Sequence, residues 1–434
     1  MVEFSNLSRA LDAGELDQTL RTLGCITPDG DVSPARARIL EAARGWMETF
    51  GDRERPLAVL SAPGRTELGG NHTDHQHGCV LAGAVTLDIL ACVSPNQENI
   101  VRFQSQGWPM VEVDLSSLEV QAKEKETTEA LVRGIAARIA QLGYQPGGFD
   151  AYTTSNVLPG SGLSSSAACE VLLGVIWNHL YCGDRLNPVE IAQIGQYAEN
   201  VYFGKPSGLM DQMASSVGGA VSIDFADPAA PVIRPVAVDL AAQGYGLCIV
   251  DSGADHADLT AEYASIPKEM GEIAAFFGKK VLRQVEESEV MAQLPALRKA
   301  AGDRAVLRAM HFFQENRRAI EEAEALERGE FERFLSLVEE SGRSSWMYLQ
   351  NIAPTGSVSQ QAIAVALMAA REALGDAGAC RIHGGGFAGT IQVFVPLGML
   401  EDFCSRMESA LGKGCCHVLS IRPVGGAVVW PLEA

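Results

Sequence analysis

Apolar residues recur along the chain with two different spacings, which predict a mixture of strands and helices. Short runs rich in branched or aromatic side chains predict strands at residues 57–60, 147–155, 218–225, 245–250 and 390–395. Longer runs predict helices at residues 126–142, 167–180, 188–201 and 400–412. Because strands and helices mix in both halves of the chain, we expect an α/β or α+β protein.

The first fifty residues predict helices that precede the first strand. Ser33 stands directly before Pro34, and proline is common at the first helical position, so we expect Ser33 to cap a helix. A chain of 434 residues is too long for one ordinary core. The Asp-Pro-Ala-Ala-Pro stretch at 227–231 is the best linker candidate. We therefore expect domains at residues 1–226, with a helical lead-in at 1–55, and 227–434.

Composition and charge narrow the function classes. The chain has 54 acidic against 34 basic residues and a net charge of −20. Because that charge repels polyanions and no basic stripe is evident, we expect no nucleic-acid partner, although a local pocket can still bind a nucleotide. The longest apolar stretch, about residues 79–93, is broken by Asp88 and is too short to span a bilayer, so we expect no membrane association.

The N-terminus and the cysteines indicate a cytoplasmic location. The first residues have neither the basic region nor the apolar run of a secretory signal. The ten cysteines are scattered and form no Cys-x-x-Cys pair, so we expect free thiols.

The densest group of polar residues lies at 61–74, Ser-Ala-Pro-Gly-Arg-Thr-Glu-Leu-Gly-Gly-Asn-His-Thr-Asp, directly after a predicted strand. It places an arginine, a histidine and an aspartate beside a turn. One interpretation of this region is a binding site for a transition-metal ion. Short groups of histidines are weak evidence for such a site. Its ligands would be His72, Asp74, His75 and His77.

Two glycine-rich segments add the features of a phosphate site. Residues 158–168, Leu-Pro-Gly-Ser-Gly-Leu-Ser-Ser-Ser-Ala-Ala, open a predicted helix. Backbone N–H groups at a helix N-terminus bind anions, and serine hydroxyls can reach phosphate oxygens or Mg²⁺. A serine-capped turn is the simpler alternative, but the unbroken run favours a nucleotide site.

The third segment, residues 383–389, is His-Gly-Gly-Gly-Phe-Ala-Gly. It matches Gly-x-Gly-x-x-Gly formally, but no βαβ unit with an acidic residue about 20 positions later accompanies it. An oxidoreductase is therefore disfavoured, and a loop over phosphates explains the segment better. The loop of P-loop kinases and the protein-kinase motifs are both absent.

These segments resemble the motifs of the GHMP kinases, and the galactokinases in particular. The first resembles Gly-Arg-x-Asn-x-x-Gly-Glu-His-Thr-Asp, and the second matches Pro-x-Gly-x-Gly-Leu-Ser-Ser-Ser-Ala. The third matches Gly-Gly-Gly-Phe-Gly-Gly except at Ala388, and residues 208–212, Gly-Leu-Met-Asp-Gln, resemble Gly-Ile-Met-Asp-Gln. The matches run in order from about residue 57 to 395, so the resemblance spans most of the chain.

The resemblance implies a two-domain GHMP-kinase fold. An N-terminal ribosomal-protein-like βαβ domain and a C-terminal ferredoxin-like domain would enclose the site in the cleft between them. It implies transfer of the γ-phosphoryl group of ATP, with Mg²⁺, to the anomeric hydroxyl of galactose. The expected partners are therefore small molecules, and we expect a monomer or weak dimer.

The same resemblance assigns roles to individual residues. Asp211 would be the catalytic aspartate, and Arg65 its partner, which lowers the pKa of the aspartate and neutralises charge on the transferred group. Contacts to the sugar are expected from Asn71, His72, Asp74, Gly208 and Tyr263. Contacts to ATP are expected from Gly160, Gly162, Leu163, Ser164, Ser165, Ser166, Gly385 and Gly386. Ser165 and Glu199 would bind Mg²⁺.

Two departures from the family pattern concern the sugar. The family glutamate that bonds the C6 hydroxyl is Asn71 here, and the family asparagine is Glu67. An amide at position 71 would not repel a C6 carboxylate, so galacturonate is the alternative to galactose, as in a galacturonokinase. A non-catalytic sugar sensor is a third hypothesis. The complete serine run, with Arg65, Glu199 and Asp211 present, predicts an active enzyme instead.

Overall fold

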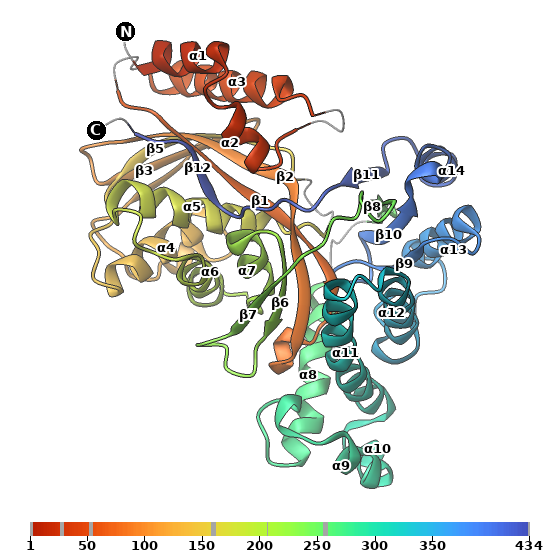
Figure 1. The fold of residues 1–434 in the computed structure, drawn as a ribbon. Helices are drawn as coiled ribbons and strands as arrows, with labels where there is room; N and C mark the ends of the chain where they lie inside the picture. The colour runs from red at the N-terminus through yellow and green to blue at the C-terminus, as the bar shows by residue number, and fades with distance from the viewer. Residues whose placement is uncertain are drawn as a thin grey trace.

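Two β-sheets organise the computed structural model, shown in Figure 1. The structure describes residues 3–26, 30–51, 55–157, 162–205, 207–254 and 259–432. The first sheet has eight strands in the order β12-β1-β2-β5-β3-β4, with β6 paired to β2 and β7 paired to β6. The second has four strands in the order β11-β8-β10-β9.

The first sheet is built around two long, buried strands. Its strands are β1 (Ala58–Gly69), β2 (Cys79–Pro95), β3 (Ile100–Ser105), β4 (Val111–Asp114), β5 (Phe149–Ser155), β6 (Ala220–Asp224), β7 (Val232–Val236) and β12 (Ala427–Trp430). Every residue of β1 is buried. Strands that are covered on both faces show continuous apolar runs, which explains why β1 and β2 lack the alternation of a half-exposed strand.

Helices cover both faces of this sheet (Figure 1). One layer contains α1 (Glu3–Ala13), α2 (Asp17–Thr22) and α3 (Ser33–Phe50), and the other contains α4 (Thr128–Gln141), α5 (Ser165–Tyr181), α6 (Pro188–Tyr197) and α7 (Met210–Val217). Successive residues of a strand point to opposite faces. Val59 accordingly packs with the first helical layer, whereas Ala58 and Leu60 belong to the core beneath α5.

The lead-in helices are confirmed, but the cap of α3 differs from the prediction. Ser33 is the first residue of α3, with Pro34 in its first turn. The side chain of Asp31 serves this end instead, because its Oδ1 accepts hydrogen bonds from the backbone N and Oγ of Ser33 at 2.9 and 2.8 Å. The indole of Trp46 donates to the carbonyl of Asp150 at 3.0 Å, which attaches α3 to the sheet.

The second sheet has the strand pattern expected of a ferredoxin-like unit. It consists of β8 (Tyr245–Asp251), β9 (Ala379–Ile382), β10 (Thr390–Pro396) and β11 (Cys416–Leu419). Its helices α13 (Ala362–Leu374) and α14 (Leu400–Leu411) share one apolar cluster with β8, β9 and β10. Between β8 and β9 the chain forms α8 (Thr260–Phe276), α9 (Glu287–Ala292), α10 (Leu294–Ala301), α11 (Asp303–Glu327) and α12 (Phe331–Ser344).

Short helical turns complete the fold. Four are 3₁₀ turns: η1 (Asp74–Gln76), η2 (Ala122–Glu124), η4 (Leu282–Gln284) and η6 (Leu397–Met399). Two are π-helical: η3 (Ala198–Phe203), which follows α6, and η5 (Ser345–Leu349), which follows α12. The predicted helix at 188–201 is thus an α-helix that ends at Tyr197 and continues as a π-helical turn. In the described part of the chain, no helix is both long and apolar enough to cross a bilayer.

The pairing of β7 and β12 with the first sheet indicates where the boundary between the two domains lies. β7 lies beyond residue 227 but pairs with β6 in the first sheet. The C-terminal strand β12 returns to pair with β1. We therefore propose a division between β7 and β8, with the last strand added to the N-terminal unit, in place of the expected boundary between residues 226 and 227.

Candidate active site

A cleft of about 530 Å³ gathers side chains from both halves of the chain. Its lining includes Arg65, Glu67, Asn71, His72, Asp74, Glu199, Lys205, Gly208, Asp211, Tyr263, Gly384 and Gly385. Both expected catalytic residues and all five expected sugar contacts are among them. Four sequence segments that lie far apart in the chain therefore meet in one cavity.

Arg65 and Asp211 form a bidentate ion pair in this cleft. Arg65 Nε and Nη2 donate to the two carboxylate oxygens of Asp211, each at 2.7 Å. The hydroxyl of Ser164 donates to Asp211 Oδ2, also at 2.7 Å. The arginine side chain is 7% exposed and the aspartate side chain 31% exposed. The carboxylate is thus held from behind and remains open to the cleft.

The surroundings of Asp211 keep it ionised. Enclosure by the protein raises the pKa of this carboxyl, but the charge and hydrogen bonds of Arg65 and the hydroxyl of Ser164 outweigh that effect. The net pKa of Asp211 lies below its ordinary value. The group is therefore a hydrogen-bond acceptor at neutral pH.

The serine-rich segment lies beside this pair. α5 begins at Ser165, as expected, and Ser164 precedes it with a left-handed φ of 56°. Arg65 links the two motifs, because its backbone N donates to Leu163 O at 3.0 Å and its Nη1 donates to Gly162 O. Ser165 is half-buried and Ser166 is exposed, whereas the Leu163 side chain lies in the core. Gly160 lies outside the described residues.

Glu199 is part of a second polar group, on the π-helical turn η3. It is 4% exposed, and its carboxylate accepts hydrogen bonds from Lys205 Nζ at 3.0 Å and Ser207 Oγ at 2.6 Å. Gln212 Nε2 donates both to Glu199 at 2.9 Å and to Glu170 at 2.8 Å. Burial, and then the charge of Glu199, raises the pKa of Glu170 well above its ordinary value. This shift favours the neutral form of the Glu170 carboxyl group.

The expected sugar contacts lie at the other end of the cleft. Burial, and then the nearby His75, lowers the pKa of His72 to about 3, so its imidazole is neutral. Its Nε2 lies 3.0 Å from the carbonyl of Gly385, which fixes the proton on that nitrogen because a carbonyl can only accept. A Cβ atom at Gly208 would overlap Asp74 Oδ2, so a larger residue there would displace the Asp74 carboxylate.

Asn71 and Glu67 are hydrogen-bonded to each other. Asn71 Nδ2 lies 3.1 Å from Glu67 Oε1 and also donates to Gly384 O at 2.8 Å, while its Oδ1 accepts from Asn351 at 3.0 Å. Arg381 donates to Glu67 Oε1 at 3.0 Å. Burial raises the pKa of Glu67, and Arg381 and then Arg65 oppose that rise. The two departures from the family pattern thus form one buried unit.

The glycine-rich loop at 383–389 is attached to this end of the cleft through its carbonyls. Gly384 O accepts from Asn71, Gly385 O from His72 and Asn351, and Gly386 O from the Tyr263 hydroxyl at 2.8 Å. A Cβ atom at Gly385 would overlap the Tyr263 ring. Burial raises the pKa of Tyr263 to about 12, so its hydroxyl remains a donor.

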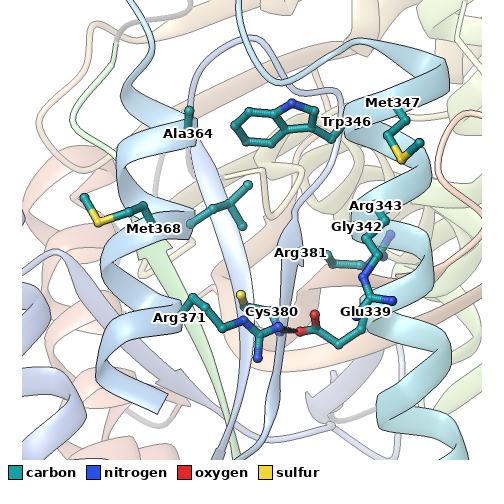
Figure 2. Close-up of a pocket in the computed structure, with 11 residues that line it drawn as sticks. Glu339, Gly342, Arg343, Trp346, Met347, Ala364, Met368, Arg371, Cys380 and Arg381 are labelled. Carbon is teal, nitrogen blue, oxygen red and sulfur yellow. Dashed lines mark hydrogen bonds and ion pairs between the residues drawn. The ribbon is translucent and has the colours of Figure 1, made fainter. Parts of the chain in front are cut away.

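Several residues of this site fall outside the family motifs, and the sequence interpretation missed them. Lys205 and Ser207 line the cleft beside Glu199. Gln212, which also lines it, lies within the 208–212 motif but was assigned no role from the sequence. Arg381 and Glu170 stand behind it. Arg381 is buried between the cleft and a separate hollow of about 340 Å³, which lies between α12, η5 and α13 (Figure 2). The available signal was a glutamate, Glu170, within the apolar helix predicted at residues 167–180.

The transition-metal interpretation of the histidine group is wrong. Among the described residues, which include 72–77 in full, His72, Asp74, His75 and His77 do not bring three ligand atoms together. His72 and His75 stack instead, with ring centroids 6.0 Å apart.

Comparisons with known proteins agree with this geometry. Residues 46–95 match the galactokinase galactose-binding signature, and residues 130–219 match the GHMP kinases N terminal domain. The chain is 32% identical over 390 residues to a galactokinase of Streptomyces coelicolor, covering 87% of this chain and 97% of that protein.

Solved structures share the fold. A Lactococcus lactis galactokinase complexed with galactose has a TM-score of 0.77 at 24% identity, and the match covers 90% of this chain and 99% of that one. A mevalonate kinase of Methanococcus jannaschii has a TM-score of 0.56 at 14% identity, with 85% and 99% covered.

Proposed function

This chain belongs to the galactokinase family, and we propose that it transfers the γ-phosphoryl group of ATP to the anomeric hydroxyl of galactose. The observation that carries the proposal is the ionised Asp211, which Arg65 and Ser164 hold facing the cleft. Sugar kinases need such a carboxylate beside the attacking hydroxyl, because phosphoryl transfer depends on positioning and on charge stabilisation.

In this proposal Asp211 accepts a hydrogen bond from the anomeric hydroxyl of the sugar. As the anomeric oxygen bonds to the γ-phosphorus of ATP, the bond from that phosphorus to the β–γ bridging oxygen breaks and ADP leaves. The hydroxyl proton passes to the carboxylate, or is lost to solvent while the carboxylate orients the oxygen. Arg65 and Lys205 are cations that line the cleft, so both can offset the negative charge on the transferred group. Enclosure of the cleft strengthens these interactions by excluding water.

We assign the sugar to the end of the cleft formed by Asn71, His72, Asp74, Gly208 and Tyr263. The N-terminus of α5 and the glycine-rich loop would receive the phosphates of ATP, at Gly160, Gly162, Leu163, Ser164, Ser165, Ser166, Gly385 and Gly386. The backbone N–H groups at the start of α5 supply the anion-binding feature. The side chain of Leu163 would contribute only packing, because it is buried.

We further propose that Glu199 and Ser165 hold Mg²⁺. A carboxylate and a hydroxyl suit this hard cation, and the Glu199 carboxylate accepts hydrogen bonds from partners that are all donors. Burial and the charge of Glu199 raise the pKa of Glu170 behind it, which disfavours a second negative charge there. When bound, Mg²⁺ neutralises charge on the phosphates.

Galactose is favoured over galacturonate as the substrate. The amide of Asn71 is already engaged by Glu67, Gly384 and Asn351, so it offers little to a substrate carboxylate. Glu67 lines the same part of the cleft, and a carboxyl group there disfavours an anionic C6 group.

The test is ADP release by the purified protein with ATP and Mg²⁺, comparing galactose and galacturonate at equal concentrations. We expect turnover on galactose and at least tenfold less on galacturonate. Turnover on galacturonate alone would contradict the substrate assignment while leaving the phosphotransfer assignment intact. No turnover on either sugar, with both ATP and sugar bound, would favour the non-catalytic sensor.

A further inference from the structure

Three cysteines from separate elements meet at the edge of the second sheet. Cys248 lies on β8, Cys416 on β11 and Cys404 on α14. Their Sγ atoms all lie within 4.8 Å of one another, and all three are free thiols. Cys248 is buried, whereas Cys404 and Cys416 are half-buried. No other group of described residues brings three histidine, cysteine, aspartate or glutamate ligand atoms together in this way.

The fold explains why the three sulfur atoms converge. Cys416 pairs with Val250 and Val418 pairs with Cys248 in the antiparallel ladder, so both cysteines point to the same face of the sheet. α14 packs on that face, where Phe403 and Met407 share the apolar cluster that also contains Cys248. Cys404, also on α14, packs against the edge of the same cluster, and its Sγ lies within 4.8 Å of those of the two strand cysteines.

The spacing suits a thiolate-bound metal ion. A zinc–sulfur bond is about 2.3 Å, so two thiolates on a tetrahedral ion lie about 3.8 Å apart. Sulfur atoms within 4.8 Å reach that separation by small changes in side-chain torsion.

We propose that Cys248, Cys404 and Cys416 form a binding site for a thiophilic d¹⁰ metal ion, Zn²⁺ or Cu⁺. Soft thiolate ligands select these ions over Mg²⁺, which prefers oxygen. Binding displaces the thiol protons into solvent, so affinity rises with pH. The site is separate from the cleft, since none of the three cysteines lines it.

The position of Cys248, Cys404 and Cys416, here called the triad, gives a bound ion a structural role. The backbone N of Asp251 donates to Cys415 O at 2.8 Å, and that of Ser252 donates to Gly389 O at 2.9 Å. The end of β8 thereby connects the three cysteines to Gly389, the last residue of the glycine-rich loop. An ion that joins β8, β11 and α14 would fix this edge of the sheet and raise the thermal midpoint of unfolding.

The test is an anaerobic titration of the reduced full-length protein with Zn²⁺, Cu⁺ and, as a spectroscopic probe, Co²⁺, each alone. We expect one equivalent of Zn²⁺ or Cu⁺ to bind, and a thiolate-to-cobalt charge-transfer band to appear with Co²⁺. Cys404→Ser and Cys416→Ser should each abolish the band and weaken Zn²⁺ binding at least 100-fold. Cys25→Ser, a matched half-buried cysteine outside the triad, should change neither.

A second measurement on the unaltered chain guards against variants that fail to fold. Bound Zn²⁺ should protect Cys248, Cys404 and Cys416 from alkylation, as mapped by mass spectrometry, and leave the alkylation of Cys25 unchanged. The proposal is overturned if the reduced protein binds no ion stoichiometrically, or if the cobalt band persists in folded Cys404→Ser. It is also overturned if Zn²⁺ protects a different set of cysteines.

Discussion

Arg65 is the residue on which the charge state of Asp211 most depends. Two parallel hydrogen bonds at 2.7 Å and the positive charge of the Arg65 guanidinium together favour the ionised form of the aspartate in an enclosed cleft. Lysine could replace the charge but not the two-pronged geometry. The pair therefore fixes both the ionisation and the direction of the carboxylate.

The pH dependence of turnover tests this pairing. In the intact protein the pKa of Asp211 is lowered, so turnover that needs its ionised form should persist to the acid side of an ordinary aspartate. Arg65→Gln removes the cation, so the pKa rises and the acid limb of the kcat profile should move to higher pH. We also expect kcat to fall about 10²- to 10³-fold. An unchanged acid limb in folded Arg65→Gln would show that Asp211 does not set it.

The exchange of amide and carboxyl between positions 67 and 71 has a testable consequence. Relative to the galactokinase pattern, each position carries the other's group, and the two side chains are hydrogen-bonded. Glu67→Asn leaves the buried Arg381 without its carboxyl partner, and we expect a loss of about 3–5 kcal/mol in the free energy of unfolding. Asn71→Glu places two carboxyl groups together and should also destabilise.

Combining the two substitutions restores the family arrangement. The double variant should be more stable than the sum of the single variants predicts, by about 1–3 kcal/mol, and should recover turnover on galactose. Urea denaturation of all four proteins measures this coupling. Additive losses would show that the two positions act independently.

At the scale of elements, sequence motifs predict some of the helices around the cleft. Others are evident only from the structure. The serine-rich run predicts the start of α5, and the structure begins that helix at Ser165. The π-helical turn η3 was not predictable, because a π-helical turn and an α-helix have the same apolar pattern over six residues. Glu199 was singled out only through its resemblance to a family position.

Long-range pairs were also beyond the sequence. Arg381 on β9 and Glu67 near the end of β1 are 314 positions apart, yet their side chains are hydrogen-bonded. Gln212 links α7 to both α5 and η3 through hydrogen bonds, and no local sequence pattern predicts these contacts. The sequence could therefore predict which residues belong to the cleft but not what holds them in place.

Gln212 on α7 is hydrogen-bonded to Glu170 on α5 and to Glu199 on η3. We expect different outcomes when each of these two glutamates is replaced by glutamine. Burial raises the pKa of Glu170 well above its ordinary value, which favours its neutral form. Glu170→Gln puts another neutral hydrogen-bonding group in its place, so kcat should stay within about twofold of the unaltered protein. Glu199→Gln removes a charge proposed to bind Mg²⁺, and the half-saturating Mg²⁺ concentration should rise at least tenfold. Mg²⁺ titrations of turnover measure both, and similar behaviour of the two variants would contradict the assignment.

At the scale of the whole molecule, the C-terminal segment ties the N-terminal sheet together. Arg422 is fully buried just before β12, and its guanidinium donates to Ser61 Oγ at 2.7 Å and Asp88 Oδ2 at 3.2 Å. Burial raises the pKa of Asp88, and Arg38 with Arg422 more than reverses that rise. The last strand is therefore part of the first sheet both by pairing and by charge.

Removing this arginine should destabilise the whole chain. Arg422→Ala leaves Asp88 buried with Arg38 as its remaining cation, and we expect the free energy of unfolding to fall by about 3 kcal/mol. The loss should be largest above the unfolded pKa of aspartate, where Asp88 is ionised, and should shrink as the pH falls below it. Denaturant unfolding at two pH values measures this, and a pH-independent loss would implicate packing alone.

The overall division into two sheets with a cleft between the motifs was predictable, because the family pattern spans most of the chain. The return of β12 to β1 was not, since a short apolar strand near the C-terminus carries no sign of its partner.

The most direct test of the account is the identity of the phosphorylated product. Galactose, ATP and Mg²⁺ are incubated with the purified protein and with Asp211→Asn, and the products are examined by ³¹P and ¹H NMR. We predict phosphate on the anomeric oxygen of galactose with the unaltered protein. We predict no product from Asp211→Asn, which should still bind ATP. Phosphate on another hydroxyl, or retained turnover by Asp211→Asn, would contradict the central role assigned to the Arg65–Asp211 pair.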